Sequence, residues 1–355
     1  MKILVLSIFL LSNCSWRQKD FKKEMEKPVE PTTQVQVDEK LREKFEVKPV
    51  EEPTAPEAVP APEVVLEKPQ VPGTAGKKKK VPAAPTVKVP PAVEAKVIPP
   101  VVKGPPKDYP PELLALNAKA KKVWDQYKPN HKTGEKIYLD IHYLGMTVGK
   151  ILVQNHGKKM IDDKEVWHFH ARFKSAPFYS NIYELDDTVD TYVTTDKFLS
   201  IKYSLIQRES KQDIDDLQLH DRENLKTFWF YHQKKSNGSV KDKKDEKPIP
   251  YYSTDAFSIL FLYQGLPLKN GDVYEIPIIN KGKLLVLKSL VEGREKIKTD
   301  KGVKNAVRIH ATTQYTGETL KSGDLYFWFS DDDRKTLLKA QAKIKIGSVT
   351  ADIVD

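Results

Sequence analysis

The sequence predicts a mainly β domain, an antiparallel meander curled into a barrel or folded as a sandwich, carried on a disordered proline-rich stalk. Three observations predict it. The prolines are segregated, because 19 of the 25 lie between Pro28 and Pro111. After residue 134, short runs alternate apolar and polar residues, as strands with one buried face do. Turn sequences such as Asn-Gly separate these runs, and short turns join antiparallel strands.

The first 14 residues have the pattern of an export signal that ends in a lipidation site. Lys2 precedes an apolar run over residues 3–11, which is shorter than the roughly 20 residues that a membrane-spanning helix needs. The run ends in Leu11-Ser12-Asn13-Cys14, which resembles the bacterial lipobox, although Asn13 replaces the small residue that usually precedes the cysteine. We expect a signal peptide at residues 1–13 and acyl chains, palmitate among them, that anchor Cys14 in the membrane.

The position of this cysteine has two consequences. Cys14 is the only cysteine of the chain, so its lipidation excludes disulfides and thiol chemistry from the mature protein. In Gram-negative envelopes, an Asp directly after the lipidated cysteine commonly retains a lipoprotein at the inner membrane, whereas this chain has Ser15. The expected location is therefore the cell envelope, at the outer membrane and facing the periplasm.

Residues 14–108 are predicted to be a disordered linker. They are rich in Pro, Lys, Glu, Val and Ala and poor in aromatic residues, so they cannot bury enough apolar surface to offset the loss of chain entropy on folding. Their Lys-Pro and Pro-Glu units resemble the spacers of periplasm-spanning proteins. Asp38–Val47 is predicted to form at most a transient helix, because it is too short to be stable alone.

The net charge of +10 is spread along the chain, with +4 over residues 1–108 and +6 over the remainder. Nucleic-acid-binding proteins concentrate their basic residues on one element, so nucleic acid is not an expected partner. The one clean basic run, Lys77–Lys80, lies in the linker and is expected to be solvated.

The folded part is predicted to begin with a bracing helix within residues 109–133 and to continue as a β domain over residues 134–355. The helix starts at Pro110-Pro111 and has one apolar face: Leu113, Leu116, Ala120, Val123 and Trp124. Alternation predicts strands at residues 137–143, 166–173, 198–206, 228–233, 273–279, 284–291, 307–313, 324–329, 337–344 and 348–354. Thr254–Tyr263 opens with capping residues and lacks alternation, which predicts a short buried helix, and Lys241–Lys247 is predicted to be a charged surface loop.

Short sequence pieces occur in a fixed order within residues 134–355. They are Gly134–Tyr138, Tyr143–Gly145, Gly149, Asp255–Leu262, Leu266–Leu268, Gly271-Asp272, Gly293–Ile297, Trp328–Arg334 and Ile346–Ala351. In order and spacing they resemble an exported bacterial family, domain of unknown function 3108. The chain departs from that family at Leu337-Leu338, where a proline is frequent. The resemblance implies an all-β exported domain and supplies no catalytic residue.

Large aromatic side chains are the strongest sign of a ligand. Residues 228–231 (Phe-Trp-Phe-Tyr) and 326–329 (Tyr-Phe-Trp-Phe) place rings on both faces of their strands, and one face of each must be core. Rings on the other face can stack on acyl chains or sugars. The candidate ligand-binding aromatics are Trp229, Tyr231, Tyr326 and Trp328, and the alternative is that the sheet core accounts for them.

Two polar patterns are weaker. His168 and His170 share one face of a strand and could supply two metal ligands, but no third ligand lies nearby in the sequence, so half-exposed strand residues are the favoured interpretation. Acidic residues cluster in two places, interpreted as a polar turn and as a solvated strand and turn, respectively: Asp331–Asp333, and Asp213, Asp215, Asp216 and Asp221.

No nucleophile elbow, Walker loop or dinucleotide fingerprint occurs in the sequence, and we expect no cofactor and no enzyme activity. The leading hypothesis is a membrane-anchored envelope module that binds an apolar or glycan ligand, or an envelope protein. The alternative is a structural tether that docks on the cell wall or on an envelope complex. An uncharacterised hydrolase ranks below both.

Overall fold

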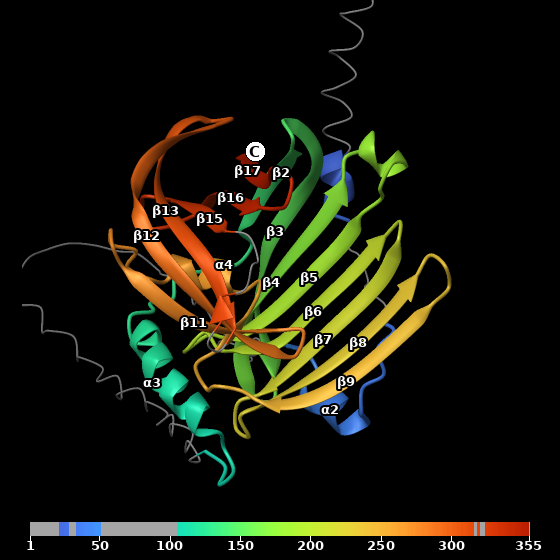
Figure 1. Cartoon of the computed structure of the whole chain (residues 1–355), viewed down its shortest axis with the longest axis vertical. Helices are drawn as coiled ribbons and strands as arrows, with labels where there is room; N and C mark the ends of the chain where they lie inside the picture. The colour runs from blue at the N-terminus through green and yellow to red at the C-terminus, as the bar shows by residue number, and fades with distance from the viewer. Residues whose placement is uncertain (1–20, 28–32, 51–104, 316–317, 320–323, 355) are drawn as a thin grey trace, which may run out of the picture. The chain divides into compact units, whose positions relative to one another are not determined.

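The computed structural model describes residues 21–27, 33–50, 105–315, 318–319 and 324–354 (Figure 1). Its helical elements are residues 21–25, α2 (Glu39–Lys44), α3 (Pro111–Trp124), the 3-10 turn η1 (Tyr179–Asn181) and α4 (Ile259–Gln264). Its strands are β1 (Lys48–Pro49), β2 (Lys136–Tyr143), β3 (Met146–Ile161), β4 (Lys164–Ser175), β5 (Asp186–Thr194), β6 (Ser200–Glu209), β7 (Gln212–Asp221), β8 (Lys226–Lys235), β9 (Val240–Pro248), β10 (Thr254–Asp255), β11 (Val273–Asn280), β12 (Lys283–Thr299), β13 (Gly302–Tyr315), β14 (Glu318–Thr319), β15 (Leu325–Ser330), β16 (Leu337–Lys343) and β17 (Ser348–Val354).

The strands form one sheet in which chain neighbours are sheet neighbours, from β10 to β17 and from β2 to β9, and β17 pairs with β2. Apart from the parallel pair β10–β11, the pairings between the described strands are antiparallel. The predicted antiparallel meander is therefore confirmed. The sheet curls without closing: β10 approaches β6, where Ser200 Oγ donates to Asp255 Oδ2 at 2.7 Å, and β7 to β9 continue past this contact to a free edge (Figure 1).

The concave face of the sheet holds the main core together with the short helix α4. Asp255 Oδ1 accepts hydrogen bonds from the backbone N–H groups of Phe257 and Ser258 at 2.9 and 2.8 Å, which starts the turn that leads into α4. Phe261 then stacks on Phe169 with 3.8 Å between ring centroids. The predicted short buried helix is confirmed, although its first residues, Thr254 and Asp255, form β10.

Helix α3 braces one end of this core, as predicted. It packs against β11 and buries Leu113, Ala120, Val123 and Trp124, and proline occupies its first position. Behind it, Tyr127 lies so close to Gly265 that a Cβ there would meet the tyrosine Cε2 at 2.2 Å. Only glycine leaves room for this contact.

The convex face is covered by residues 33–50, which we call the N-terminal strap. Its helix α2 and Phe45 pack on an apolar cluster of β3 to β8 that includes Ile161, Val166 and Leu219. Lys44 Nζ lies 2.9 Å from Asp221 Oδ2, and β1 pairs with the part of β3 that extends beyond β2. The sequence placed these residues in the disordered linker. The structure differs because packing against the sheet stabilises a helix that is too short to form alone.

Other predictions need correction. Lys241–Lys247 is not a loop but most of the edge strand β9, which is exposed on both faces and therefore shows no alternation. Its lysines suit a free sheet edge, because charged side chains oppose pairing with another chain. Asp215, Asp216 and Asp221 of β7 are buried rather than solvated. Asp215 is paired with Arg208 at 2.7 Å, and Asp216 accepts a hydrogen bond from Trp229 Nε1 at 3.1 Å.

The predicted signal peptide, Cys14 and linker residues 51–104 lie outside the described residues. Within the described part of the chain, no helix combines the length and the apolar character needed to cross a bilayer.

Candidate apolar ligand site

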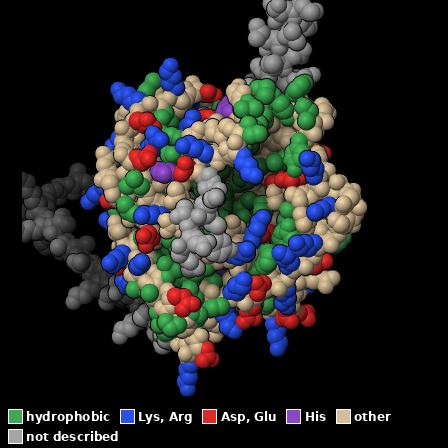
Figure 2. Space-filling view, in the orientation of Figure 1, with side chains coloured by type: hydrophobic (Ala, Val, Ile, Leu, Met, Phe, Trp, Pro, Cys, Tyr) green, Lys and Arg blue, Asp and Glu red, His purple; other side chains and the backbone are tan. Residues whose placement is uncertain are grey.

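An apolar cavity of about 520 Å³ opens at the end of the sheet where β2, β3, β4 and β17 lie next to one another. Figure 2 shows hydrophobic side chains gathered in the hollow of the curled sheet and along the edge above it. The volume is within the usual range for small-molecule sites. The lining residues are Ile141, Tyr143, Val148, Gly149, Lys174, Ser175, Tyr179, Ile182, Tyr183, Leu185, Ile344 and Val349.

The strand register brings these residues together. Val349 is opposite Tyr143, Ile141 is opposite Gly149, and Gly149 is opposite Ser175 across four adjacent strands. At Gly149 a Cβ would lie 2.7 Å from the carbonyl oxygen of Lys174, so glycine keeps these strands close. The β2–β3 turn contains Leu144 and Gly145 at φ 48° and 80°, the left-handed pair of a two-residue hairpin.

The polar atoms around the cavity already have partners within the protein. Lys174 Nζ is 2.8 Å from Asp186 and 3.1 Å from Glu24. Ser175 Oγ donates to the carbonyl oxygen of Tyr183 at 2.9 Å. The Tyr183 hydroxyl donates to Glu209 at 2.6 Å, and this hydrogen bond raises the pKa of Tyr183 to about 12. The cavity therefore offers an apolar wall with few groups available for a polar ligand.

The four predicted aromatics do not line this cavity, and they do not meet in one place. On β8, Trp229 is buried against the β11–β12 turn, where a Cβ at Gly282 would lie 2.9 Å from the Trp229 Cβ. The ring centroids of Trp229 and Tyr231 are 5.7 Å apart. On β15, the rings of Tyr326 and Trp328 form a satellite cluster on the convex face.

Cations cover the second aromatic pair. The guanidinium carbon of Arg308 lies 4.9 Å from the Tyr326 ring and 5.6 Å from the Trp328 ring, and Lys339 is 5.6 Å from Trp328. Because both rings are largely buried beneath these side chains, they form a packed cation–π cluster and not an open binding platform.

His168 and His170 share a partly buried carboxylate partner, Asp190, instead of an open metal site. Asp190 Oδ1 is 2.6 Å from His168 Nε2 and 2.9 Å from His170 Nδ1, and the His156 ring lies 4.9 Å from that of His168. Burial lowers the pKa of His156 to about 4. Although burial opposes it, hydrogen bonding from the two histidines holds the pKa of Asp190 below its usual value. Among the described residues, no three His, Cys, Asp or Glu side chains are grouped to hold a metal ion.

The acidic turn at Asp331–Asp333 has structural contacts. Asp332 Oδ1 accepts hydrogen bonds from the backbone N–H groups of Arg334 and Lys335 at 3.0 and 3.1 Å, and Asp331 pairs with Arg294 at 3.0 Å. These contacts close the turn between β15 and β16.

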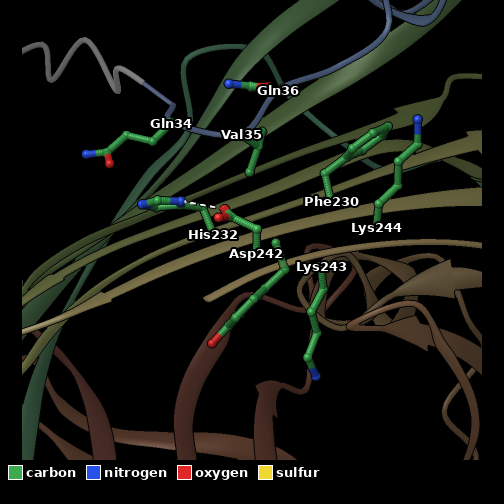
Figure 3. A pocket seen from close by; sticks show the side chains of 9 residues that line it. Gln34, Val35, Gln36, Phe230, His232, Asp242, Lys243 and Lys244 are labelled. Carbon is green, nitrogen blue, oxygen red and sulfur yellow. Dashed lines mark hydrogen bonds and ion pairs between the residues drawn. The ribbon is translucent and has the colours of Figure 1, made fainter. Parts of the chain in front are cut away.

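A second cavity, of about 440 Å³, lies between the N-terminal strap and strands β8 and β9. In Figure 3, strap residues Gln34–Gln36 lie across from Phe230 and His232, while Lys243 points away from them. His232 Nδ1 is 2.7 Å from Asp242 Oδ1. The sequence could not indicate this cavity, because it requires the strap to be docked.

Comparisons with other proteins place the chain in a family without indicating a function. Among curated proteins, no sequence matches it. A β-barrel-like protein of domain of unknown function DUF1849 from Brucella abortus is 10% identical, with 63% of this chain and 96% of that chain covered and a TM-score of 0.39. A protein with a YmcC-like fold from Bacteroides fragilis is 10% identical, with 64% and 96% covered and a TM-score of 0.29. The profile of the family described as protein of unknown function, DUF3108, matches residues 139–354, as the sequence pieces predicted. The chain therefore belongs to the DUF3108 family.

Proposed function

We propose that this protein is a non-enzymatic envelope module that holds an apolar ligand, such as an acyl chain, in the cavity at the β2–β4 and β17 end of the sheet. The observation that carries the proposal is the chemistry of the lining. Aliphatic and aromatic side chains form nearly all of it, and the polar atoms of Lys174, Ser175 and Tyr183 are engaged with other protein groups.

The same chemistry favours an acyl chain over a glycan. A sugar needs hydrogen-bond partners for its hydroxyl groups, and burying those groups without partners costs several kcal/mol. An acyl chain gains about 0.8 kcal/mol for each methylene group that it buries. The outward-facing rings that could have stacked on sugars, Tyr326 and Trp328, lie beneath Arg308 and Lys339.

A cavity-filling variant tests the proposal. Val148 lines the cavity, and Val148→Trp would fill part of it. We expect the purified protein to bind the fluorescent fatty acid cis-parinaric acid, and Val148→Trp to weaken this binding at least tenfold. Val303→Trp is the matched control, because Val303 is exposed at the β12–β13 turn. Native mass spectrometry of protein purified from an envelope without detergent would identify a natural ligand. Absence of both a bound mass and probe binding would refute the proposal and favour the structural tether.

The proposed location rests on the N-terminal sequence. We propose that the chain is exported, lipidated at Cys14 and held at the outer membrane, since Ser15 follows the cysteine. Growth with labelled palmitate should label the wild type and not Cys14→Ser, and membrane fractionation should recover the wild type in the outer membrane. A labelled Cys14→Ser protein would contradict the assignment of the anchor.

A further inference from the structure

The mouth of the apolar cavity is surrounded by exposed apolar side chains. Three turns form this rim, which comprises residues 144–147, 176–183 and 344–347. Its large apolar residues are between 47% and 72% exposed: Leu144, Met146, Phe178, Ile182, Ile344 and Ile346. Among the described residues, twelve large apolar side chains are exposed, and these six are half of them. Such a concentration at one place marks an interaction surface.

Contacts between the turns show that the rim is one surface. The Tyr179 hydroxyl lies 3.0 Å from Met146 Sδ, which joins the β4–β5 connection to the β2–β3 turn. The Tyr143 hydroxyl donates to the carbonyl oxygen of Ile346 at 3.3 Å, which joins the β2–β3 turn to the β16–β17 turn. Ile182 and Ile344 come from different turns and line the same cavity.

The rim is also nearly free of charge. Its three segments contain one charged residue, Lys345, whereas 30% of the chain is Asp, Glu, Lys or Arg. Lys345 is exposed and stands between Ile344 and Ile346. A lysine flanked by apolar residues can keep its ammonium group at the level of lipid phosphates while its stem lies in apolar surroundings.

The path of the chain brings this end of the domain near the predicted anchor. Residues 21–25 are helical, and Phe21 and Met25 pack on Leu152 of β3. Glu24 contacts Lys174, which lines the cavity. Only six residues separate Phe21 from Cys14, and the seven steps between them span at most about 25 Å when fully extended. The long proline-rich segment comes later in the chain, after β1, so it does not separate this end of the domain from the lipid.

We propose that the rim inserts into the surface of a phospholipid bilayer and turns the mouth of the cavity toward the acyl chains. A protein partner would have to fill the cavity with its own side chains, whereas a bilayer supplies chains of the right chemistry. The acyl chain that would enter the cavity belongs to the proposed function, and this part of the inference rests on it. Insertion of the rim does not.

Vesicle flotation tests the insertion. The protein would be the mature chain from residue 14 with Cys14→Ser, so that no attached lipid binds the membrane, and the vesicles would contain phosphatidylethanolamine and phosphatidylglycerol. The rim variant combines Met146→Ser, Phe178→Ser and Ile346→Ser, none of which lines the cavity. The matched control combines Val240→Ser, Val273→Ser and Val303→Ser, three valines that are also more than half exposed and lie outside the rim.

We expect the wild type and the control to float with the vesicles and the rim variant to bind about 1,000-fold more weakly, since each of the three large apolar side chains removed from water contributes about tenfold. Lys345→Gln should weaken binding about fivefold, and only on vesicles with phosphatidylglycerol. An environment-sensitive dye on Phe178→Cys should shift to shorter wavelength on vesicles, and one on Val303→Cys should not.

The outcomes separate the two proposals. If the rim variant still binds cis-parinaric acid and fails to float, both proposals stand. If the wild type floats but binds no fatty acid, the ligand proposal fails and the inserted rim stands. The rim proposal is overturned if the wild type does not float, if the rim variant floats as well as the control, or if the rim substitutions instead abolish a dimer or a protein complex.

Discussion

Docking of the N-terminal strap should depend on Phe45, and Phe45→Ala is the sharpest perturbation of it. Phe45 is 2% exposed and lies within the cluster formed by Ile161, Val166 and Leu219. An aromatic side chain buries about 150–250 Å², worth about 4–6 kcal/mol at about 25 cal/mol per Å². Alanine retains part of this contribution, so we expect a loss of about 3–5 kcal/mol in the free energy of unfolding.

The loss in the free energy of unfolding cannot exceed the free energy that docking of the whole strap contributes. If docking of the whole strap contributes less than this amount, the variant will release the strap and lose only the docking energy. Urea denaturation followed by tryptophan fluorescence measures the loss of stability. Tryptic cleavage after Lys44, which is paired with Asp221 in the docked strap, measures release of the strap. Phe178→Ala is the control, because Phe178 is 72% exposed and its removal should change stability by less than about 0.5 kcal/mol. An unchanged midpoint together with unchanged cleavage would refute the reasoning.

Two further predictions concern the concave side of the sheet. Burial raises the pKa of Asp216 to about 6, so the folded state binds a proton that the unfolded chain has released, and stability falls as the pH rises from about 4 through 6. Asp216→Asn should therefore gain about 3 kcal/mol near pH 8 and almost nothing near pH 4 in paired denaturation curves; an equal gain at both would contradict the pKa assignment. The difference between the two proteins isolates Asp216, since burial also raises the pKa of Asp187 to about 6. Gly265→Ala should destabilise by about 1–3 kcal/mol, because its Cβ would overlap Tyr127. Gly265 has φ −88°, so backbone strain does not add to this overlap. Equal melting temperatures for Gly265→Ala and the wild type would show that Tyr127 moves aside freely.

Strands such as β4 and β12 were predicted because one face is more deeply buried than the other, whereas β15 is buried on both faces. Alternation such as that at residues 166–173 follows directly from this, and it located β4 and most of the other strands. Strand β9 escaped because both of its faces are exposed, and its lysines looked like a loop. Strand β7 was misjudged because charged residues in a sequence predict an exposed segment. Asp215 and Asp216 are nevertheless buried, with partners from β6 and β8.

The candidate site was less predictable than the fold. Aromatic rings drew attention to Trp229 and Trp328, but a ring is equally suited to packing under a cation or against a turn, and the sequence does not say which neighbour it meets. The cavity is instead lined by Ile141, Ile182 and Val349, which lie in separate parts of the chain and are ordinary apolar residues when considered singly. The low charge of the three turns was the one local signal that could have indicated their role.

By itself, the sequence determined the class of the domain, two of its helices and its family, and it predicts the address encoded around Cys14, because each depends on residues close together in the chain. Only the tertiary structure decided that the strap docks, that β10 approaches β6, and that three distant turns form one apolar mouth. Val35, Leu41 and Phe45 have no structure-forming pattern of their own, and their burial is gained only against strands more than 100 residues away. Such contacts arise from the shape of the folded sheet, which no short stretch of sequence encodes.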